Sequence, residues 1–116
     1  MTSEPTRPTA MTDELAALAP KWREVTRDVL FGDIWERPEL SKRDRSLITC
    51  AALIALYRGN ELRSHLGRAL DNGVTQEEII EMITHLAFYS GWPNAMSAVN
   101  RAKTLLVKPG GTRSAD

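Results

Sequence analysis

The sequence predicts an all-α fold, a compact helical bundle of about six helices. Three observations support this fold class. Apolar residues recur at helical spacing, as in Leu62, Leu66 and Ala69. Residues that favour helix starts and helix ends bracket such stretches, and no stretch alternates apolar with polar residues as a half-buried strand would. We expect flexible tails at residues 1–11 and 108–116, around one domain at residues 12–107.

The first two predicted helices lie before residue 32. Thr12 can cap a short helix through LAAL, and Pro20 suits the first turn of a second helix that runs toward Leu30. A turn around Gly32 and the Arg37-Pro38 step end this part of the chain. The apolar side of the second helix is predicted to consist of Trp22, Val25, Val29 and Leu30.

The central helix is predicted to be the most buried one. Ser41, with Asp44 three residues later, approximates a capping box, and the stretch LITCAALIALY then continues to Gly59, the expected C-terminal cap. Asn60 can cap the next helix, which is expected to end at Asn72-Gly73.

Two more helices complete the predicted bundle. Thr75 and Glu78 form a capping box for a helix that is expected to end near Gly91. Pro93 then opens the last helix, and the Lys108-Pro109 step closes it.

The composition restricts the partners of this chain. A domain of 116 residues leaves little protein for a deep pocket, so we expect a substrate site to borrow walls from a second subunit. Fifteen basic residues balance fifteen acidic ones, which argues against nucleic acid and membrane partners, since both require concentrated positive charge. The N-terminus lacks an apolar signal core, and the run CAALIALY is too short to span a bilayer. We therefore expect a cytoplasmic protein that binds a small molecule.

Metal and thiol chemistry are not expected. Cys50 is the only cysteine, so one chain can form neither a disulfide nor a CxxC pair nor a cysteine zinc cluster. Because Cys50 lies in an apolar helix, we expect it to serve as packing. The two histidines form no HxxxH or HxxE pair, so no metal site is predicted.

Glu61, His65 and Arg68 are spaced i, i+4 and i+7, which places them on one flank of a helix. His65 falls at the border of the apolar stripe and is expected to be half buried. Glu61 would raise the pKa of the imidazole toward neutral pH, which makes His65 a candidate general acid or base. The alternative is an ordinary row of ion pairs on a solvated surface.

The predicted helix after Thr75 carries a second face. Its core stripe is expected to contain Ile79, Ile80, Ile83, Leu86 and Ala87. His85, Phe88 and Tyr89 project away from that stripe, and a second subunit would cover Phe88 while His85 and Tyr89 line the crevice. The alternative is a surface Glu81–His85 pair beside one exposed aromatic residue. We expect a homo-oligomer on this ground.

Four further residues are candidates for substrate binding. Trp92 and Asn94 lie where the last helix begins, and the free N–H groups there can receive a carboxylate. The alternatives are a core role for Trp92 and a capping role for Asn94. Arg43 and Arg45, before the central helix, could clamp a carboxylate, although such runs of charge are also typical of solvated faces.

Residues 40–103 resemble the carboxymuconolactone decarboxylase family. The segments that carry the resemblance occur in the family's order: RDRSL, ELRSHL, ALDNGVTQEEI and HLAFYSGWPNA. The resemblance implies the alkyl hydroperoxidase D-like fold, with small helical subunits assembled into a ring, as a trimer or a hexamer. The peroxidases of this fold carry a CxxCxxxH motif and an upstream glutamate. Here Arg58 and Glu61 stand at the cysteine positions, His65 is the histidine and Ser46 replaces the glutamate, which implies the decarboxylase branch.

The resemblance implies a cofactor-free decarboxylase that acts on 4-carboxymuconolactone or a related carboxylated lactone or acid in aromatic compound catabolism. Carbon dioxide loss would leave a dienolate, with the substrate's own carbonyl as electron sink. His65 is then the proton donor and Glu61 orients it. His85 and Tyr89 are donors to the enolate or a carboxylate, and Arg43 or Arg45 is the clamp. The alternatives are a cofactor-independent lyase, isomerase or cyclase on another enolisable compound, and a non-catalytic oligomer of the same fold.

Overall fold

The computed structural model describes residues 12–106, and every regular element in that range is helical, so the all-α prediction is confirmed. The predicted tails at 1–11 and 108–116, and residue 107, lie outside the described residues. The elements, in chain order, are α1 (Asp13–Leu18), α2 (Pro20–Val25), the π-helical turn η1 (Thr26–Phe31), the 3-10 turn η2 (Ile34–Glu36), α3 (Lys42–Ala55), α4 (Gly59–Asp71), α5 (Gln76–Tyr89) and α6 (Trp92–Ala102).

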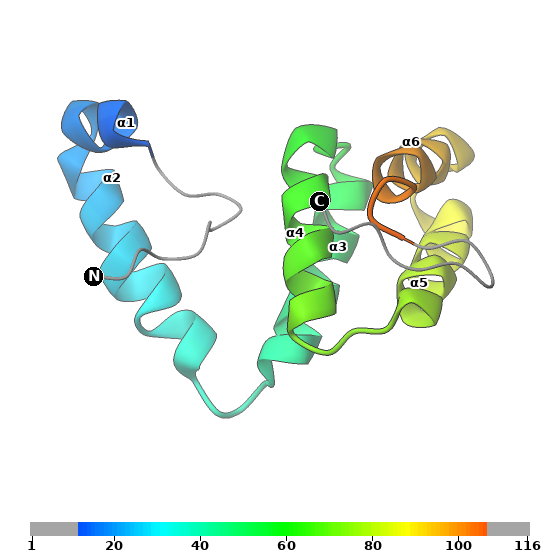
Figure 1. Ribbon diagram of the computed structural model, residues 1–116, viewed down its shortest axis with the longest axis horizontal. Coiled ribbons are helices and arrows are strands. Elements are labelled where there is room, and N and C mark those ends of the chain that lie inside the picture. Colours follow the sequence, from blue (N-terminus) through cyan, green and yellow to red (C-terminus); the bar gives the residue numbers. More distant parts are fainter. Residues whose placement is uncertain (1–11, 107–116) are drawn as a thin grey trace.

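The helices form two parts, an N-terminal arm of α1, α2, η1 and η2 and a bundle of α3 to α6 (Figure 1). In Figure 1, α1 and α2 stand apart from the bundle, and the arm joins it near η2. No residue of the four arm elements is buried. The apolar side predicted for the second helix is therefore exposed in the single subunit, and the compact arrangement that the sequence predicted applies only to α3–α6.

The core of the bundle lies between α3, α4, α5 and α6. Leu62, Leu66 and Ala69 are buried, as the helical spacing predicted. The other buried apolar residues are Cys50, Ile54, Val74, Ile79, Ile83, Ala95, Ala98 and Ala102. Ile80 was wrongly predicted to be a core residue, because it is 41% exposed. The helix α3, which was predicted to be the most buried one, contacts the other three helices of the bundle. That prediction is wrong, because α4 has the larger set of buried residues.

The side-chain caps predicted at three helix starts are confirmed. Thr12 Oγ1 accepts from the Leu15 amide at 3.2 Å, and Ser41 Oγ accepts from the Asp44 amide at 3.0 Å. In the capping box, Thr75 Oγ1 accepts from the Glu78 amide and Glu78 Oε1 accepts from the Thr75 amide. Each of these bonds satisfies a backbone N–H that the helix itself leaves without a partner.

The boundary between α3 and α4 differs from the prediction. The helix α3 ends at Ala55, and Tyr57 takes the left-handed conformation (φ 61°) that was expected of a glycine. Gly59 is instead the first residue of α4, and neither it nor Asn60 is a cap. A Cβ at Gly59 would lie 2.8 Å from the guanidinium of Arg101 on α6, so a larger residue there would require this exposed side chain to move.

The later boundaries follow the predicted residues more closely. Asn72 is the C-terminal cap of α4, and Gly73 after it has φ 103°. Gly91, with φ 104°, separates α5 from α6, whose first turn contains Pro93. The helix α6 ends at Ala102, earlier than predicted. The Lys108-Pro109 step lies outside the described residues.

Candidate active site

His65 lies inside the bundle. Its side chain extends from α4, and the residue is only 7% exposed, so the prediction of a half-buried position is wrong. Its Nδ1 atom is buried and has no hydrogen-bond partner within residues 12–106. Buried polar atoms in folded proteins almost always have a partner, so an unsatisfied one requires an explanation.

Two charged residues flank His65 on α4. Glu61 precedes it by one turn and Arg68 follows it by one turn, as the spacing predicted. The pKa of His65 is nevertheless lowered from 6.5: burial is the largest cause, the positive charge of Arg68 is the second, and Glu61 opposes both. The expectation that Glu61 would raise this pKa toward neutral is therefore wrong in its net result. At pH 7 the imidazole is neutral.

Two aromatic residues of the arm hold Arg68. Its guanidinium carbon lies 4.8 Å from the ring centroid of Phe31 and 5.5 Å from that of Trp35. The two rings are 6.2 Å apart, centroid to centroid. Phe31 and Trp35 are not among the site residues predicted from the sequence. Helical spacing gave no signal for this pair, because Gly32 and Asp33 separate η1 from η2.

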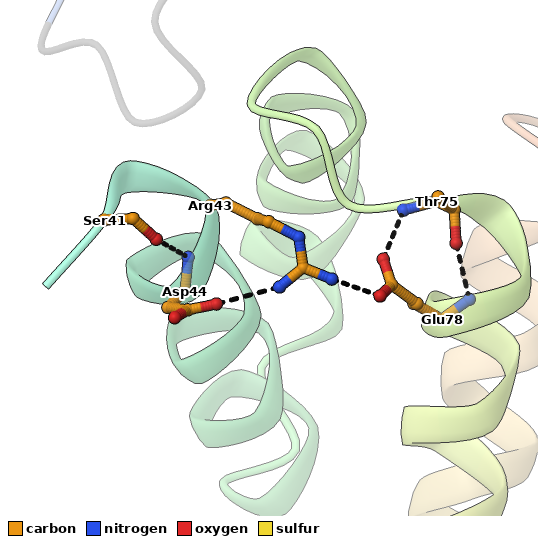
Figure 2. A network of polar contacts seen from close by, with 5 residues as sticks. All are labelled: Ser41, Arg43, Asp44, Thr75 and Glu78. Carbon is orange, nitrogen blue, oxygen red and sulfur yellow. Dashed lines mark hydrogen bonds and ion pairs between the residues drawn. The ribbon is translucent and has the colours of Figure 1, made fainter.

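Arg43 and Arg45, the predicted clamps, already have partners within the subunit. Figure 2 shows Arg43 between Asp44, which it contacts at 2.8 Å, and Glu78 of the capping box. The bond to Glu78 is the largest cause that raises the pKa of Arg43. The pKa of Glu78 is lowered, first by the Thr75 backbone and then by Arg43. Arg43 thus ties the start of α3 to the start of α5.

Arg45 holds the segment before α3. Its Nε donates to the carbonyl of Leu40 at 3.1 Å, and its Nη2 donates to the carbonyl of Arg37 at 3.2 Å. Both arginines therefore have a structural role in this subunit that accounts for their position.

The other predicted residues gather where α5 meets α6. The rings of His85 and Tyr89 stack with centroids 4.8 Å apart, and Phe88 and Trp92 make an edge-on contact at 6.4 Å. Phe88, Tyr89 and Trp92 are 79%, 78% and 64% exposed, so a core role for Trp92 is excluded in the single subunit. Asn94 is not the N-cap of α6, since Gly91 is; its Nδ2 donates to the Ala55 carbonyl at 3.2 Å.

Ser46 and Cys50 are buried in α3. Ser46 Oγ accepts from Asn72 Nδ2 at 2.9 Å. Burial raises the pKa of the Cys50 thiol to about 12, so the thiol is protonated at neutral pH and cannot act as a thiolate nucleophile.

Within residues 12–106, no three His, Cys, Asp or Glu side chains gather in a group that could hold a metal ion. No helix in the same range has the length and apolar character needed to cross a membrane.

Residues 20–104 match the model of the carboxymuconolactone decarboxylase family. The chain belongs to this family. Two curated relatives are similar to it. The 4-carboxymuconolactone decarboxylase of Acinetobacter baylyi is 44% identical over 73 residues, which cover 63% of this chain and 54% of the relative.

The second relative is the nitrosuccinic acid decarboxylase of Metarhizium robertsii. It is 36% identical over 77 residues, which cover 66% of this chain and 54% of the relative. The chain thus spans about half the length of the curated relatives that it matches. Both relatives are named as decarboxylases.

Proposed function

We propose that this protein is a carboxy-lyase that decarboxylates 4-carboxymuconolactone or a related small carboxylic acid, with His65 as the proton donor. The observation that carries the proposal is the state of His65, which is buried, has an unsatisfied Nδ1 and lies between Glu61 and Arg68 on one helix. Perturbed histidines of this kind are typical of acid–base sites. The names of the two relatives support the reaction class.

The compounds in the two relatives' names share one chemical feature. In each, the carboxylate that can leave is attached to a carbon in conjugation with an electron sink, either an unsaturated lactone or a nitro group. The C–C bond breaks, its electron pair moves to the lactone or nitro oxygen, and carbon dioxide departs. A proton must then be added to carbon. Because the substrate supplies its own sink, the reaction requires no pyridoxal, thiamine or metal.

His65 supplies that proton. In the free protein its pKa is lowered and the imidazole is neutral. A bound carboxylate substrate brings negative charge close to His65. This charge raises the pKa of the imidazole and favours its protonated form, the imidazolium. The imidazolium gives its proton to the carbanion carbon and regains one from solvent. Glu61 supports the charged form, since its own contribution raises the pKa of His65. We also assign to Glu61 the role of orienting the ring when the substrate is bound.

We also infer that the active form is a homo-oligomer. The single subunit exposes large apolar side chains on the arm and at the α5–α6 junction, including Leu18, Trp22, Phe88 and Trp92. Burial of such side chains against a second subunit would favour association. In such an assembly His85 and Tyr89 of one subunit would reach the substrate of another as donors to its oxygens. A monomer mass by light scattering at micromolar concentration would contradict this inference.

The proposed reaction is tested with purified protein and two substrates, 4-carboxymuconolactone and nitrosuccinate. We expect release of one carbon dioxide per molecule of at least one of them, also after dialysis against EDTA. The matched control is His65→Ala, which removes only the proposed proton donor. No release from either acid would overturn the proposed reaction, and loss of turnover after EDTA that a divalent metal restores would overturn its cofactor-free course.

A further inference from the structure

We propose that the exposed apolar side of the arm packs on α6 of a second copy of this chain, and that two copies exchange their arms in this way. This inference rests on the proposed function, because it names the contact that forms the inferred homo-oligomer. Two exposed apolar stripes carry it. The arm stripe consists of Trp22, Val25 and Val29, and the α6 stripe consists of Trp92, Met96 and Val99.

The arm has no core of its own. None of its residues is buried, and α1 and α2 contain six residues each. An isolated helix shorter than about 12–15 residues is marginal in water. Within residues 12–106, neither α1 nor α2 packs against a helix of the bundle, and Figure 1 shows both apart from it. Contact with another molecule is therefore the source of stability for this part of the arm.

The α6 stripe is the matching surface on the bundle. Its three residues are four and three positions apart, so they lie on one side of α6. The exposed Phe88 of α5 extends this side, because it makes an edge-on contact with Trp92. In Figure 1, α3 and α4 stand between α6 and the arm of the same subunit. The arm of a second copy can cover the α6 stripe, and the exchange covers both stripes of each subunit.

The spacing of the two stripes fits an antiparallel contact. Read backward along the chain, the arm stripe has intervals of four and three positions, as the α6 stripe has when read forward. Two antiparallel helices with equal intervals bring three pairs of side chains together. These pairs are Val29 with Trp92, Val25 with Met96, and Trp22 with Val99.

The distribution of charge favours the same direction. The first turn of α1 contains Asp13 and Glu14, and α1 packs on α2. The helix α6 contains no acidic residue, and its end is basic, with Arg101 in the last turn and Lys103 just after it. An antiparallel contact places the acidic start of one arm at the basic end of the partner's α6. Opposite charges across an interface favour one orientation over the other.

The antiparallel contact also brings residues to the candidate active site. The arm stripe ends at Val29, just before the two rings that contact α4 one turn after His65. Trp92 of the second copy would lie at this end of the arm, together with the stacked His85 and Tyr89 of the same copy. The exchange thus places the two donors that the proposed function assigns to a neighbouring subunit beside the proton donor.

The test introduces one charge into each stripe and measures self-association of the full chain by light scattering. Trp22→Asp disables the arm stripe, and Met96→Asp disables the α6 stripe. Each change acts twice in an exchanged pair, so each should weaken self-association at least about 100-fold. Ile48→Asp is the matched control, because Ile48 is 56% exposed and Met96 54%, but Ile48 lies on α3, outside both stripes. It should associate as wild type does.

A mixture of the two variants distinguishes this contact from the other pairings. A mixed pair keeps one intact contact, between the arm of Met96→Asp and the α6 helix of Trp22→Asp. We expect native mass spectrometry to show a dimer with one copy of each, tighter than either variant alone and weaker than wild type. Two arms in mutual contact would instead leave Met96→Asp associated. Two α6 helices in mutual contact would leave Trp22→Asp associated.

Further variants test folding and direction. Trp22→Phe and Met96→Leu keep the apolar surface, so both should associate within about threefold of wild type. Glu14→Lys and Lys103→Glu should each weaken association by about 2- to 10-fold, because each places like charges at the same point of the contact. The chain that carries both changes should recover, since opposite charges face each other again.

Several results would overturn the proposal. They are a monomeric wild type at micromolar concentration, association that survives Trp22→Asp or Met96→Asp, equal weakening by Ile48→Asp, no mixed dimer, and no recovery in the double charge variant. Failure of the proposed reaction is distinguishable, because self-association is measured without substrate and does not depend on release of carbon dioxide. An oligomer that survives Trp22→Asp would overturn the arm contact alone and leave the inferred homo-oligomer in place.

Discussion

The two histidines lie in contrasting regions of the bundle. His65 is buried in α4 with an unsatisfied Nδ1 and a charged residue one turn away on either side. His85 is exposed on α5 and stacks on Tyr89, in a cluster with Phe88 and Trp92. The contrast separates two kinds of site: a buried polar group without a partner is suited to chemistry, and an exposed aromatic cluster is suited to contact with another molecule.

The difference follows from the position of each histidine on its helix. His65 lies between Leu62 and Leu66 on the buried side of α4, so the core of the bundle surrounds it. His85 follows the buried Ile83 by two positions, which at about 100° per residue turns it to the far side of α5. One residue type thus has two environments, and in the buried one the pKa of His65 is lowered, mainly by burial.

The largest expected effect is the loss of His65. His65→Ala should lower kcat by roughly two to four orders of magnitude, which is the usual contribution of a positioned general acid. His85→Ala should lower kcat by only about tenfold, because His85 would donate a single bond from a neighbouring subunit. Steady-state kinetics of both variants on the substrate that wild type accepts would measure the difference. Equal losses would remove the distinction between the two regions.

A smaller effect is expected from Glu61→Gln. Glu61 raises the pKa of His65, so its neutralisation lowers that pKa further. A protonated donor is lost as pH rises, and the limb of the pH–rate profile that His65 sets should therefore move to lower pH, with kcat at neutral pH reduced by about tenfold or less. A profile identical to that of wild type would mean that Glu61 is only a solvated neighbour.

The buried His65 should also affect stability. The pKa of His65 is 6.5 in the unfolded chain and lower in the folded chain. As the pH falls through 6.5, the unfolded chain therefore binds a proton at this histidine before the folded chain does. The free energy of unfolding therefore decreases toward acid pH. His65→Gln should remove this part of the decrease. Urea unfolding of both proteins at pH 7.5 and pH 5 checks it, and equal decreases would contradict the burial effect.

The smallest expected effect is that of Cys50→Ser. Its thiol is buried, with a pKa of about 12, and so takes no part in a reaction at neutral pH. We expect kcat and KM to remain within about twofold of wild type. A large loss of turnover with an unchanged circular dichroism spectrum would show that the thiol participates.

Local signals in the sequence predicted most helix starts. A cap acts within three residues, so Ser41 and Thr75 could be assigned without knowledge of the fold. The position of Gly59 at the start of α4 was not predicted, because a glycine at the end of an apolar stretch is also typical of a C-terminal cap.

The geometry of the candidate active site could also be predicted only where it depends on residues close together in the sequence. The row of Glu61, His65 and Arg68 follows from helical spacing, which is local. The burial of His65 depends on how α4 packs against α3 and α6. The aromatic contacts of Arg68 come from the arm. Neither could be predicted from the spacing of residues along one helix. Arg43 was predicted to be a clamp from the run of charge before the central helix. Its bond to Glu78 joins α3 to α5, which are far apart in the sequence, so local spacing could not predict it (Figure 2).

Chemical rescue tests the central claim, proton donation by His65, most directly. His65→Gly leaves a space that free imidazole can enter, and His85→Gly is the matched control on the exposed face. We predict that His65→Gly loses turnover and regains part of it as imidazole is added, with a dependence on pH that follows protonation of the added imidazole, while His85→Gly shows a small loss and no rescue. Near wild-type turnover in His65→Gly, or a larger loss in His85→Gly, would contradict the account.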